Sequence, residues 1–337
     1  MTSFDDSRLA DEAVLRAADP LLRPLAEAGA RVRREAVLAE PALAPLDDSE
    51  RPRAVIAFGP EARLLRAVLE PTCPVPLVAW PTLGLPGWVG PLDVVVVMGG
   101  GSRHSLAGAW EAVRRGSRLV VACPPDSALA RQSASAATTL LPTATGDQLA
   151  AAVVVLDALH RLGLGPVVQP SRVADALDAV ALGCAWSRDV TQNPAKRVAL
   201  ELAEAQPLVW GGSILAARAS RRVSEALRSA SGRVVLSADA GALLPLVDLV
   251  PPRDPFADPF EEAPTTLRPG LVMIDDGQDD EAAAEERARL LATAAERDVM
   301  VSRLEHSGGS AVERYVTVLQ QGLFAAAYLQ IGLSRSA

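Results

Sequence analysis

The sequence predicts an α/β protein in which doubly wound parallel sheets, flanked by helices, form two successive halves of the chain. Residues 92–123 read as strand, glycine turn, helix and strand without interruption, and the same order of elements begins again after residue 190. Strands that alternate with helices are typical of parallel sheets. The length of 337 residues also favours two cores, because single cores stop growing at roughly 250–300 residues.

The segment 92–123 carries the clearest signal. Residues 93–98 (DVVVVM) form an apolar run without alternation, which is typical of a strand buried on both faces. Three glycines follow, and Ser102 stands where a helix N-cap is expected, before a helix over about 103–115. Such a turn directs free backbone N–H groups and a helix N-terminus at one point, which suits a phosphate or another anion.

The glycine turn matches neither established nucleotide motif. GGGSRHS is not G-x-G-x-x-G and not G-x-x-x-x-G-K-[ST], so neither a dinucleotide fold nor a P-loop is indicated. Two interpretations stay open at this point: an anion-binding turn, or a plain link between a strand and a helix.

Composition excludes several classes of function. The chain has a net charge of -8, and of its 33 basic residues only Lys196 is a lysine, with no basic block, which argues against a nucleic-acid partner. The three cysteines are far apart, so neither a disulfide framework nor a zinc site is expected. We predict no membrane partner and a cytoplasmic location, because neither a signal peptide nor a long apolar span is evident.

The first half supplies further alternating elements. Leucine and alanine at helical spacing over 6–40, interrupted at Asp19-Pro20, predict two helices in an N-terminal arm. We expect domains over 1–50 (the helical arm), 51–165 and 166–337. The other elements expected before residue 165 are strands over 53–58, 75–80, 118–123 and 138–141, and helices over 61–69, 126–137 and 147–162.

The second half repeats this pattern around a second glycine turn. Gly211, Gly212 and Ser213 follow a strand over 207–211 and precede a helix that reaches residue 229, so they form a second candidate anion turn. The proline-rich segment 251–269 predicts an exposed flap. The remaining expected elements are helices over 171–182, 194–205, 279–297 and 310–331, and strands over 233–236, 271–275 and 298–304.

Several of these segments together resemble one family. NPAK at 193–196, the unit at 92–123 and the C-terminal AVERYVTVLQQGLFAAAYLQIG resemble the bifunctional phosphoglucose and phosphomannose isomerases of the sugar isomerase (SIS) superfamily, over nearly the whole chain. The resemblance implies two SIS domains, each with a five-stranded parallel sheet. It further implies a homodimer with shared active sites, a phosphorylated sugar as ligand and no cofactor.

The resemblance also implies where a phosphate would bind. The family's phosphate loop, S-Y-S-G-N-T-E-E-T, falls on residues 97–105, where Gly100, Ser102 and Ser105 are compatible and Val97 and Gly99 replace the two leading serines. The first-strand loop carries Glu61 where an anionic ligand would want donors. The predicted phosphate-binding residues are Gly59, Gly99, Gly100, Gly101, Ser102, Ser105, Gly211, Gly212, Ser213 and Arg218.

The same comparison gives one candidate catalytic base. The family motif R-w-k-x-q-x-x-E-N-x-K falls on residues 218–228 and keeps its glutamate as Glu225, which would move a proton between sugar carbons. A surface ion pair with Arg222 or Arg228 is the alternative interpretation. The family's H-N-E histidine and its C-terminal lysine have no counterpart, so we expect weak or no isomerisation of glucose, mannose and fructose 6-phosphates.

Three hypotheses about function remain open: an active isomerase, an inactive phosphosugar sensor or regulator, and a structural subunit of a dimer. His104 either replaces a lost donor in the turn or is a solvated residue of the first helical turn. We predict no metal site. The pairs Asp275-Asp276 and Asp279-Asp280 fit no D-x-[DN]-x-[DN]-G loop and are interpreted as a solvated acidic turn.

Overall fold

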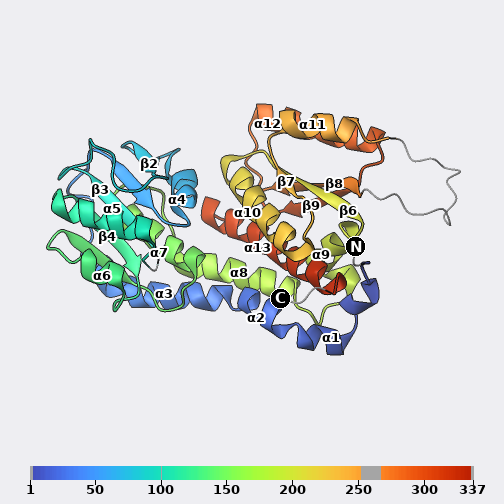
Figure 1. Cartoon of the computed structure of the whole chain (residues 1–337), viewed down its shortest axis with the longest axis horizontal. Coiled ribbons are helices and arrows are strands. Elements are labelled where there is room, and N and C mark those ends of the chain that lie inside the picture. The colour runs from blue at the N-terminus through green and yellow to red at the C-terminus, as the bar shows by residue number, and fades with distance from the viewer. Residues whose placement is uncertain (1–2, 100, 252–266, 335–337) are drawn as a thin grey trace, which may run out of the picture. The chain divides into compact units, whose positions relative to one another are not determined.

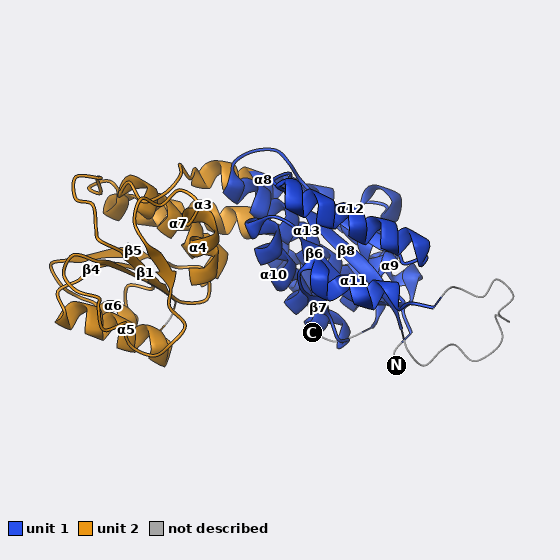
Figure 2. Cartoon of the chain, turned by 90° about the horizontal axis from the view of Figure 1, so that it is seen from above, with its two compact units in different colours: residues 1–27, 176–337 blue, residues 28–175 orange. Residues whose placement is uncertain are grey.

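The computed structural model describes residues 3–99, 101–251 and 267–334. The chain forms two compact units (Figure 2). Unit 2 comprises residues 28–175, and unit 1 comprises residues 1–27 together with residues 176–337. Each unit contains one parallel sheet, which confirms the predicted fold class.

Unit 2 is built on a five-stranded parallel sheet in the order β2-β1-β3-β4-β5. Its strands β2, β3 and β4 are labelled in Figure 1. All five residues of β3 are buried, as the apolar run without alternation predicts. Ile56, Phe58, Val95 and Val97 contribute to a core that continues into the helix after β3. The elements of unit 2 are α3 (Ala28–Leu43), β1 (Val55–Phe58), α4 (Ala62–Leu69), β2 (Leu77–Ala79), β3 (Val94–Met98), α5 (Arg103–Arg114), β4 (Arg118–Cys123), α6 (Ala128–Gln132), β5 (Thr138–Pro142) and α7 (Gln148–Arg161).

Unit 1 has a four-stranded parallel sheet within the described residues, in the order β7-β6-β8-β9, where the resemblance implies five strands. The helix α8 (Pro170–Gly183) spans the boundary between the units. The other elements are a 3-10 helix (Asp6–Leu9), α1 (Glu12–Ala17), α2 (Asp19–Ala26), a 3-10 helix (Val190–Gln192), α9 (Pro194–Glu201), β6 (Ala205–Gly211), α10 (Ile214–Ser231), β7 (Leu236–Ser237), α11 (Ala240–Asp248), β8 (Arg268–Asp275), α12 (Glu281–Glu296), β9 (Val301–Glu305) and α13 (Ala311–Gly332).

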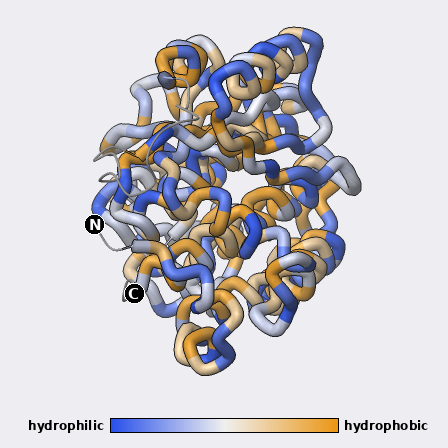
Figure 3. Tube along the Cα trace, turned by 90° about the vertical axis from the view of Figure 1, so that its right-hand side faces the viewer, coloured by the Kyte–Doolittle hydropathy of each residue, from blue (hydrophilic) through white to orange (hydrophobic). Residues whose placement is uncertain are grey.

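The buried C-terminal helix α13 organises the core of unit 1. It lies against α9 and α10, and a Cβ atom on Gly322 would be 2.4 Å from Val223, so the glycine allows the close approach of α13 to α10. The Tyr328 hydroxyl donates a hydrogen bond of 2.6 Å to the carbonyl oxygen of Cys184. Hydrophobic and hydrophilic residues alternate in short stretches along the helices (Figure 3), as expected where one face packs on a core.

Several sequence-based expectations need correction. The arm over 1–50 is not one unit, because residues 1–27 belong to unit 1 and α3 belongs to unit 2. Pro20 lies in the first turn of α2, where its missing N–H costs nothing, so it starts a helix there. The strand at 233–236 is reduced to the two-residue β7, and α11 was not predicted. Residues 252–266 of the predicted flap lie outside the described residues.

No helix in the described part of the chain combines the length and the apolar composition needed to cross a bilayer.

Candidate functional site

The strand order of unit 2 puts a topological switch point between β1 and β3. The chain leaves β1 toward the edge strand β2 on one side, and it leaves β3 toward β4 and β5 on the other. Ligands of open α/β sheets bind at such a switch point, outside the carboxyl ends of the strands. In this protein the point lies between the loop that begins at Gly59 and the turn that begins at Gly99.

Glycines allow these two loops to meet. Gly59 and Gly99 have φ values of 109° and 105°, and Gly101 has φ of 102°, all in the region that favours glycine. A Cβ atom on Gly59 would be 2.4 Å from the carbonyl oxygen of Met98, which no side chain could tolerate. The turn predicted as an anion cradle is therefore packed against the first-strand loop. Gly100, predicted to bind phosphate, lies outside the described residues.

Ser102 caps α5, as the sequence predicts. Its hydroxyl oxygen accepts a hydrogen bond from the Ser105 N–H at 3.1 Å, and the hydroxyl donates to Ser105 Oγ at 3.0 Å. Ser102 is exposed, whereas Ser105 is 2% exposed. Only Ser102 of the two predicted serines therefore faces solvent, and Ser105 supports it from beneath.

Two residues that sequence reasoning missed lie at the same turn. Gln148, the first residue of α7, brings its Oε1 atom to 3.6 Å from where a Cβ of Gly99 would be, and this oxygen is buried without a hydrogen-bond partner among the described residues. Arg103 is exposed at the first position of α5 and adds a positive charge beside Ser102. The adjacency of Arg103 to Ser102 could have been noticed in the sequence. The approach of Gln148, from 46 residues further along the chain, could not.

His104 is used differently from either prediction. It is half-buried, and its ring packs against Phe58 with 5.1 Å between centroids and an interplanar angle of 52°. The histidine is therefore an aromatic contact between α5 and β1 rather than a solvated residue.

The second predicted anion turn does not correspond to the first. In unit 1, β6 connects through α10 to the edge strand β7, as β1 connects through α4 to β2 in unit 2. Gly211-Gly212-Ser213 is thus the equivalent of the loop at Gly59, and the equivalent of the Gly99 turn is the segment after β8. That segment reads DDGQDD at residues 275–280.

Other atoms of unit 1 fill the space beside Gly211 and Gly212. A Cβ atom on Gly211 would be 2.4 Å from the carbonyl oxygen of Ala216, and one on Gly212 would be 2.5 Å from Asp279 Oδ1. Ser213 caps α10 by accepting the Ala216 N–H at 3.0 Å. Because a carboxylate already lies against Gly212, this turn is less favourable for a phosphate than the turn at Gly99, and phosphate binding by Gly211, Gly212 and Ser213 stays a prediction.

The candidate base Glu225 lies on an exposed face of α10. Its side chain is 57% exposed and forms an ion pair with Arg222, with 3.4 Å between Nη1 and Oε2. This is the surface ion pair that the sequence left as the alternative. Arg218, predicted to bind phosphate, is buried two helical turns before it in the chain, at 8% exposure.

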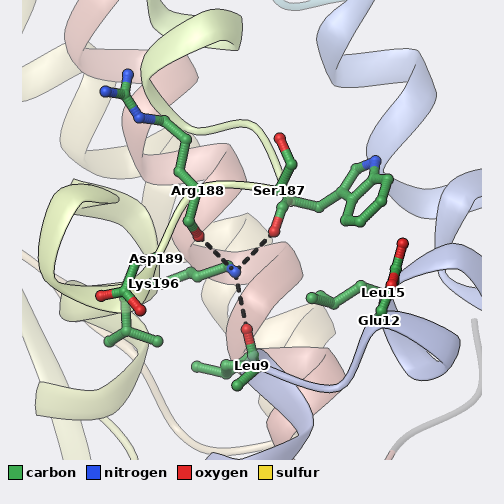
Figure 4. A pocket seen from close by; sticks show the side chains of 10 residues that line it. Leu9, Glu12, Leu15, Ser187, Arg188, Asp189 and Lys196 are labelled. Atoms are coloured by element: carbon green, nitrogen blue, oxygen red, sulfur yellow. Dashed lines mark hydrogen bonds between the residues drawn. The ribbon is translucent and has the colours of Figure 1, made fainter.

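The only lysine of the chain, Lys196, forms hydrogen bonds within the fold. Lys196 Nζ donates hydrogen bonds to the carbonyl oxygens of Leu9, Trp186 and Arg188 at 2.8, 2.8 and 2.9 Å (Figure 4). It lies at the edge of a hollow of about 420 Å³ in unit 1. Burial lowers the pKa of Lys196, and Asp189 opposes this shift. Since all three donors of the ammonium group are used, the residue ties the N-terminal segment to the loop before α9.

Asp275, Asp276 and Asp279 do not form a solvated turn, which corrects the prediction. One carboxylate oxygen from each lies within 4.8 Å of the others, Asp276 is 1% exposed, and the Asp279 side chain is 4% exposed. Burial raises the pKa of Asp279, Asp275 and Asp276 add to the rise, and Arg287 and the Ser213 N–H oppose it.

Comparison with known proteins gives evidence that is independent of the site geometry. Residues 191–333 match the model of the family described as bacterial phospho-glucose isomerase C-terminal SIS domain. A comparison with curated proteins finds no match.

Solved structures with a similar fold cover most of this chain and of their own. A glucose-6-phosphate isomerase like protein from Thermus thermophilus is 18% identical over 89% of this chain and 92% of its own, with a TM-score of 0.52. Tagatose-6-phosphate ketose/aldose isomerase from Escherichia coli is 12% identical over 95% and 94%, with a TM-score of 0.64. The C-terminal domain of glucosamine-fructose-6-phosphate aminotransferase from Francisella tularensis is 13% identical over 94% and 96%, with a TM-score of 0.62.

At these identities the solved structures show the fold alone, and the family match covers the second half of the chain. Residues 191–333 are therefore similar to the C-terminal SIS domain of bacterial phospho-glucose isomerases, and the chain as a whole shares the α/β fold of the solved structures.

Proposed function

We propose that the protein binds a phosphorylated sugar, with the phosphate at the turn between β3 and α5 of unit 2, and that it isomerises hexose phosphates weakly or not at all. The observation that carries the proposal is the meeting of Gly59 and Gly99 at the switch point, where the capped N-terminus of α5 begins. Backbone N–H groups and a helix dipole at such a point favour an anion.

The side chains around the turn support the same ligand. Exposed Ser102 and Arg103 offer a hydroxyl and a positive charge, which compensates in part for the serines replaced by Val97 and Gly99. The Oε1 atom of Gln148 has no hydrogen-bond partner among the described residues and is suited to accept a hydrogen bond from a sugar hydroxyl, whereas Nε2 already donates to the carbonyl oxygen of Gly146 at 3.3 Å. The resemblance in the second half of the chain, and the sugar phosphates named for proteins of similar fold, agree with a phosphosugar.

Weak or absent catalysis follows from the residues that isomerisation needs. A general base must be positioned at the substrate, often with a pKa shifted by burial, whereas Glu225 is an exposed partner of Arg222. The lysine that could have substituted for the missing C-terminal one is bonded to three carbonyl groups. A sensor or regulatory subunit is therefore the second candidate function.

Binding is tested with a matched pair of variants at Ser102. Asp and Asn both cap helices as well as Ser, so Ser102→Asp and Ser102→Asn should keep α5 intact, and only the first adds a negative charge at the turn. By isothermal titration calorimetry we expect Ser102→Asp to weaken fructose 6-phosphate binding about tenfold or more, and Ser102→Asn to change it much less. Equal affinities in the two variants would place the phosphate elsewhere.

Catalysis is tested with a coupled assay that converts fructose 6-phosphate to glucose 6-phosphate. We expect a rate far below that of an ordinary isomerase. Robust turnover that Glu225→Gln abolishes would overturn this part of the proposal and restore Glu225 as the base.

The family resemblance also leads us to propose a cytoplasmic homodimer. Light scattering coupled to size-exclusion chromatography tests the dimer through the mass of the particle. A monomer that still binds a sugar phosphate would remove the dimer from the proposal without affecting the site in unit 2.

A further inference from the structure

The switch point between β6 and β8 of unit 1 differs in charge from its counterpart in unit 2. Where the turn after β3 carries glycines and a serine, the turn after β8 carries Asp275, Asp276 and Asp279. The strand order puts both turns at the same topological position, outside the carboxyl ends of central strands. The turn after β8 therefore offers carboxylate oxygens, which suit a cation, where the turn after β3 offers none.

Two of these carboxylates, Asp276 and Asp279, have no hydrogen-bond partner among the described residues, and of the two only Asp279 has an ion pair. Asp275 Oδ1 accepts the Gly277 N–H at 2.7 Å, and its Oδ2 is bonded to Arg287. Arg287 also pairs with Asp279 Oδ2 at 3.3 Å. Asp276 is 1% exposed, and neither of its carboxylate oxygens has a hydrogen-bond partner among the described residues.

The charges of the cluster do not balance. Three carboxylates carry a formal charge of -3, and Arg287 supplies +1 to Asp275 and Asp279. A buried carboxylate without a hydrogen bond or a counter-charge is strongly unfavourable, so a second cation beside Asp276 would stabilise the cluster. The surplus of two negative charges matches one divalent ion.

We propose that Asp275, Asp276 and Asp279 bind a hard divalent cation of the Mg²⁺ or Ca²⁺ type at the turn after β8. These ions take carboxylate oxygens at about 2.0–2.6 Å, so oxygens that share an ion lie at most about 5 Å apart. The three carboxylate oxygens lie within 4.8 Å of one another. Water would complete the coordination shell, as is usual for Mg²⁺ bound by few carboxylates.

The site is tested by thermal melting of the full chain after treatment with EDTA. We expect about 5 mM Ca²⁺ or Mg²⁺ to raise the melting temperature of the wild type by on the order of 5 °C, because a ligand that binds only the folded state stabilises it. Asp276→Asn should lose this shift. It should also melt at a higher temperature than the wild type without added ions, because one uncompensated charge is removed.

A control variant separates ligation from general charge. Asp280 is the N-cap of α12 and accepts the Ala283 N–H at 2.8 Å, and Asn would cap equally well. Asp280→Asn should therefore keep the cation-dependent shift although it removes a charge next to the cluster. Loss of the shift in both variants would mean a diffuse charge effect and would overturn the proposal.

Electron paramagnetic resonance of added Mn²⁺ measures the number of ions bound per chain, and this readout does not depend on the melting temperature. We expect one tightly bound ion per wild-type chain and none in Asp276→Asn. Should Asp276→Asn fail to fold, the wild-type titration alone decides. Absence of binding at millimolar Mn²⁺, Mg²⁺ and Ca²⁺ would overturn the proposal. Sugar-phosphate binding at unit 2 does not enter any of these measurements.

Discussion

The carboxylate of Asp279 lies so close to Gly212 that a Cβ atom on this glycine would be 2.5 Å from Asp279 Oδ1. The same added atom would be 2.7 Å from the ring of Trp210, which is 1% exposed. Gly211 is bounded by the backbone of Ala216 and Ala217. Both glycines are therefore required by the packing of β6, α10 and the turn after β8, independently of any ligand.

We expect Gly211→Ala to lower the free energy of unfolding by about 1–3 kcal/mol, because an added methyl group would meet backbone atoms that cannot move aside. Urea denaturation followed by circular dichroism measures the change. Gly183→Ala is the matched control, because nothing lies within 4 Å of the added carbon at the end of α8. Equal destabilisation by both variants would contradict the packing argument.

The glycine turns also show how far the sequence could reach. The β3–α5 unit was predictable in detail because its signals are local: an apolar run, glycines with positive φ and the N-cap Ser102. The pairing of Gly211 with Gly99 as equivalent turns was wrong because local order does not reveal strand order. Only the sheet β7-β6-β8-β9 shows that the turn at Asp275 holds the equivalent position.

Burial was the second quantity that the sequence could not supply. DDGQDD reads as a hydrophilic turn, yet Asp276 and the side chain of Asp279 are buried. Glu225 fits a family motif, yet it lies on the exposed face of its helix. The ion pair of Glu225 with Arg222 is local and stood as an alternative in the sequence, whereas the burial of the aspartates depends on the packing of β6, α10 and α12 around the turn, which composition and periodicity do not record.

We expect Lys196→Met to destabilise unit 1 by several kcal/mol. Each of the three carbonyl oxygens that the ammonium group bonds would lose its donor, at about 1–3 kcal/mol for each oxygen that stays buried and unsatisfied. Met keeps most of the side-chain volume, so the loss reports on hydrogen bonding. Chemical denaturation is the measurement.

Arg66→Met makes a comparable change at an exposed cation, and it serves as the control. Arg66 pairs with Glu70 on α4 with both side chains about half exposed, and such i,i+4 pairs contribute only about 0.3–0.5 kcal/mol. If Lys196→Met were as mild as Arg66→Met, the lysine would not be a structural tie.

Glu35 should be the most sensitive carboxylate of unit 2. It is fully buried on α3 and accepts the N–H groups of Ala144 and Thr145 and the Thr145 hydroxyl, all just before α7. Glu35→Gln would turn an amide NH₂ group toward these donors, and we expect a loss of about 1–3 kcal/mol in unfolding experiments. Glu40→Gln, on the exposed side of α3 where Glu40 pairs with Arg161, should cost less than about 1 kcal/mol. The reverse ranking would show that α3 is not held through Glu35.

The three cysteines should differ in reactivity in the folded protein. Burial raises the pKa of Cys123, and it raises the pKa of Cys184 to about 11, whereas Cys73 is only partly buried. Because the thiolate is the reactive form, a disulfide reagent at pH 8 should modify one thiol quickly and two only after denaturation. Rapid modification of all three in the native state would contradict the burial of the other two.

The raised pKa of Cys184 also predicts a loss of stability at alkaline pH. Below pH 9, the thiol is protonated in both the folded and the unfolded chain, so it adds no pH dependence. Between pH 9 and about 11 the unfolded chain releases this proton and the folded protein keeps it, so the free energy of unfolding falls as pH rises, by at most about 2–3 kcal/mol. Tyr328, whose pKa burial also raises above its ordinary value, acts in the same direction at higher pH. The free energy of unfolding, measured from pH 8.5 to 10, should therefore fall less steeply with pH in Cys184→Ala than in the wild type. Identical slopes in the two proteins would show that Cys184 ionises freely in the folded protein.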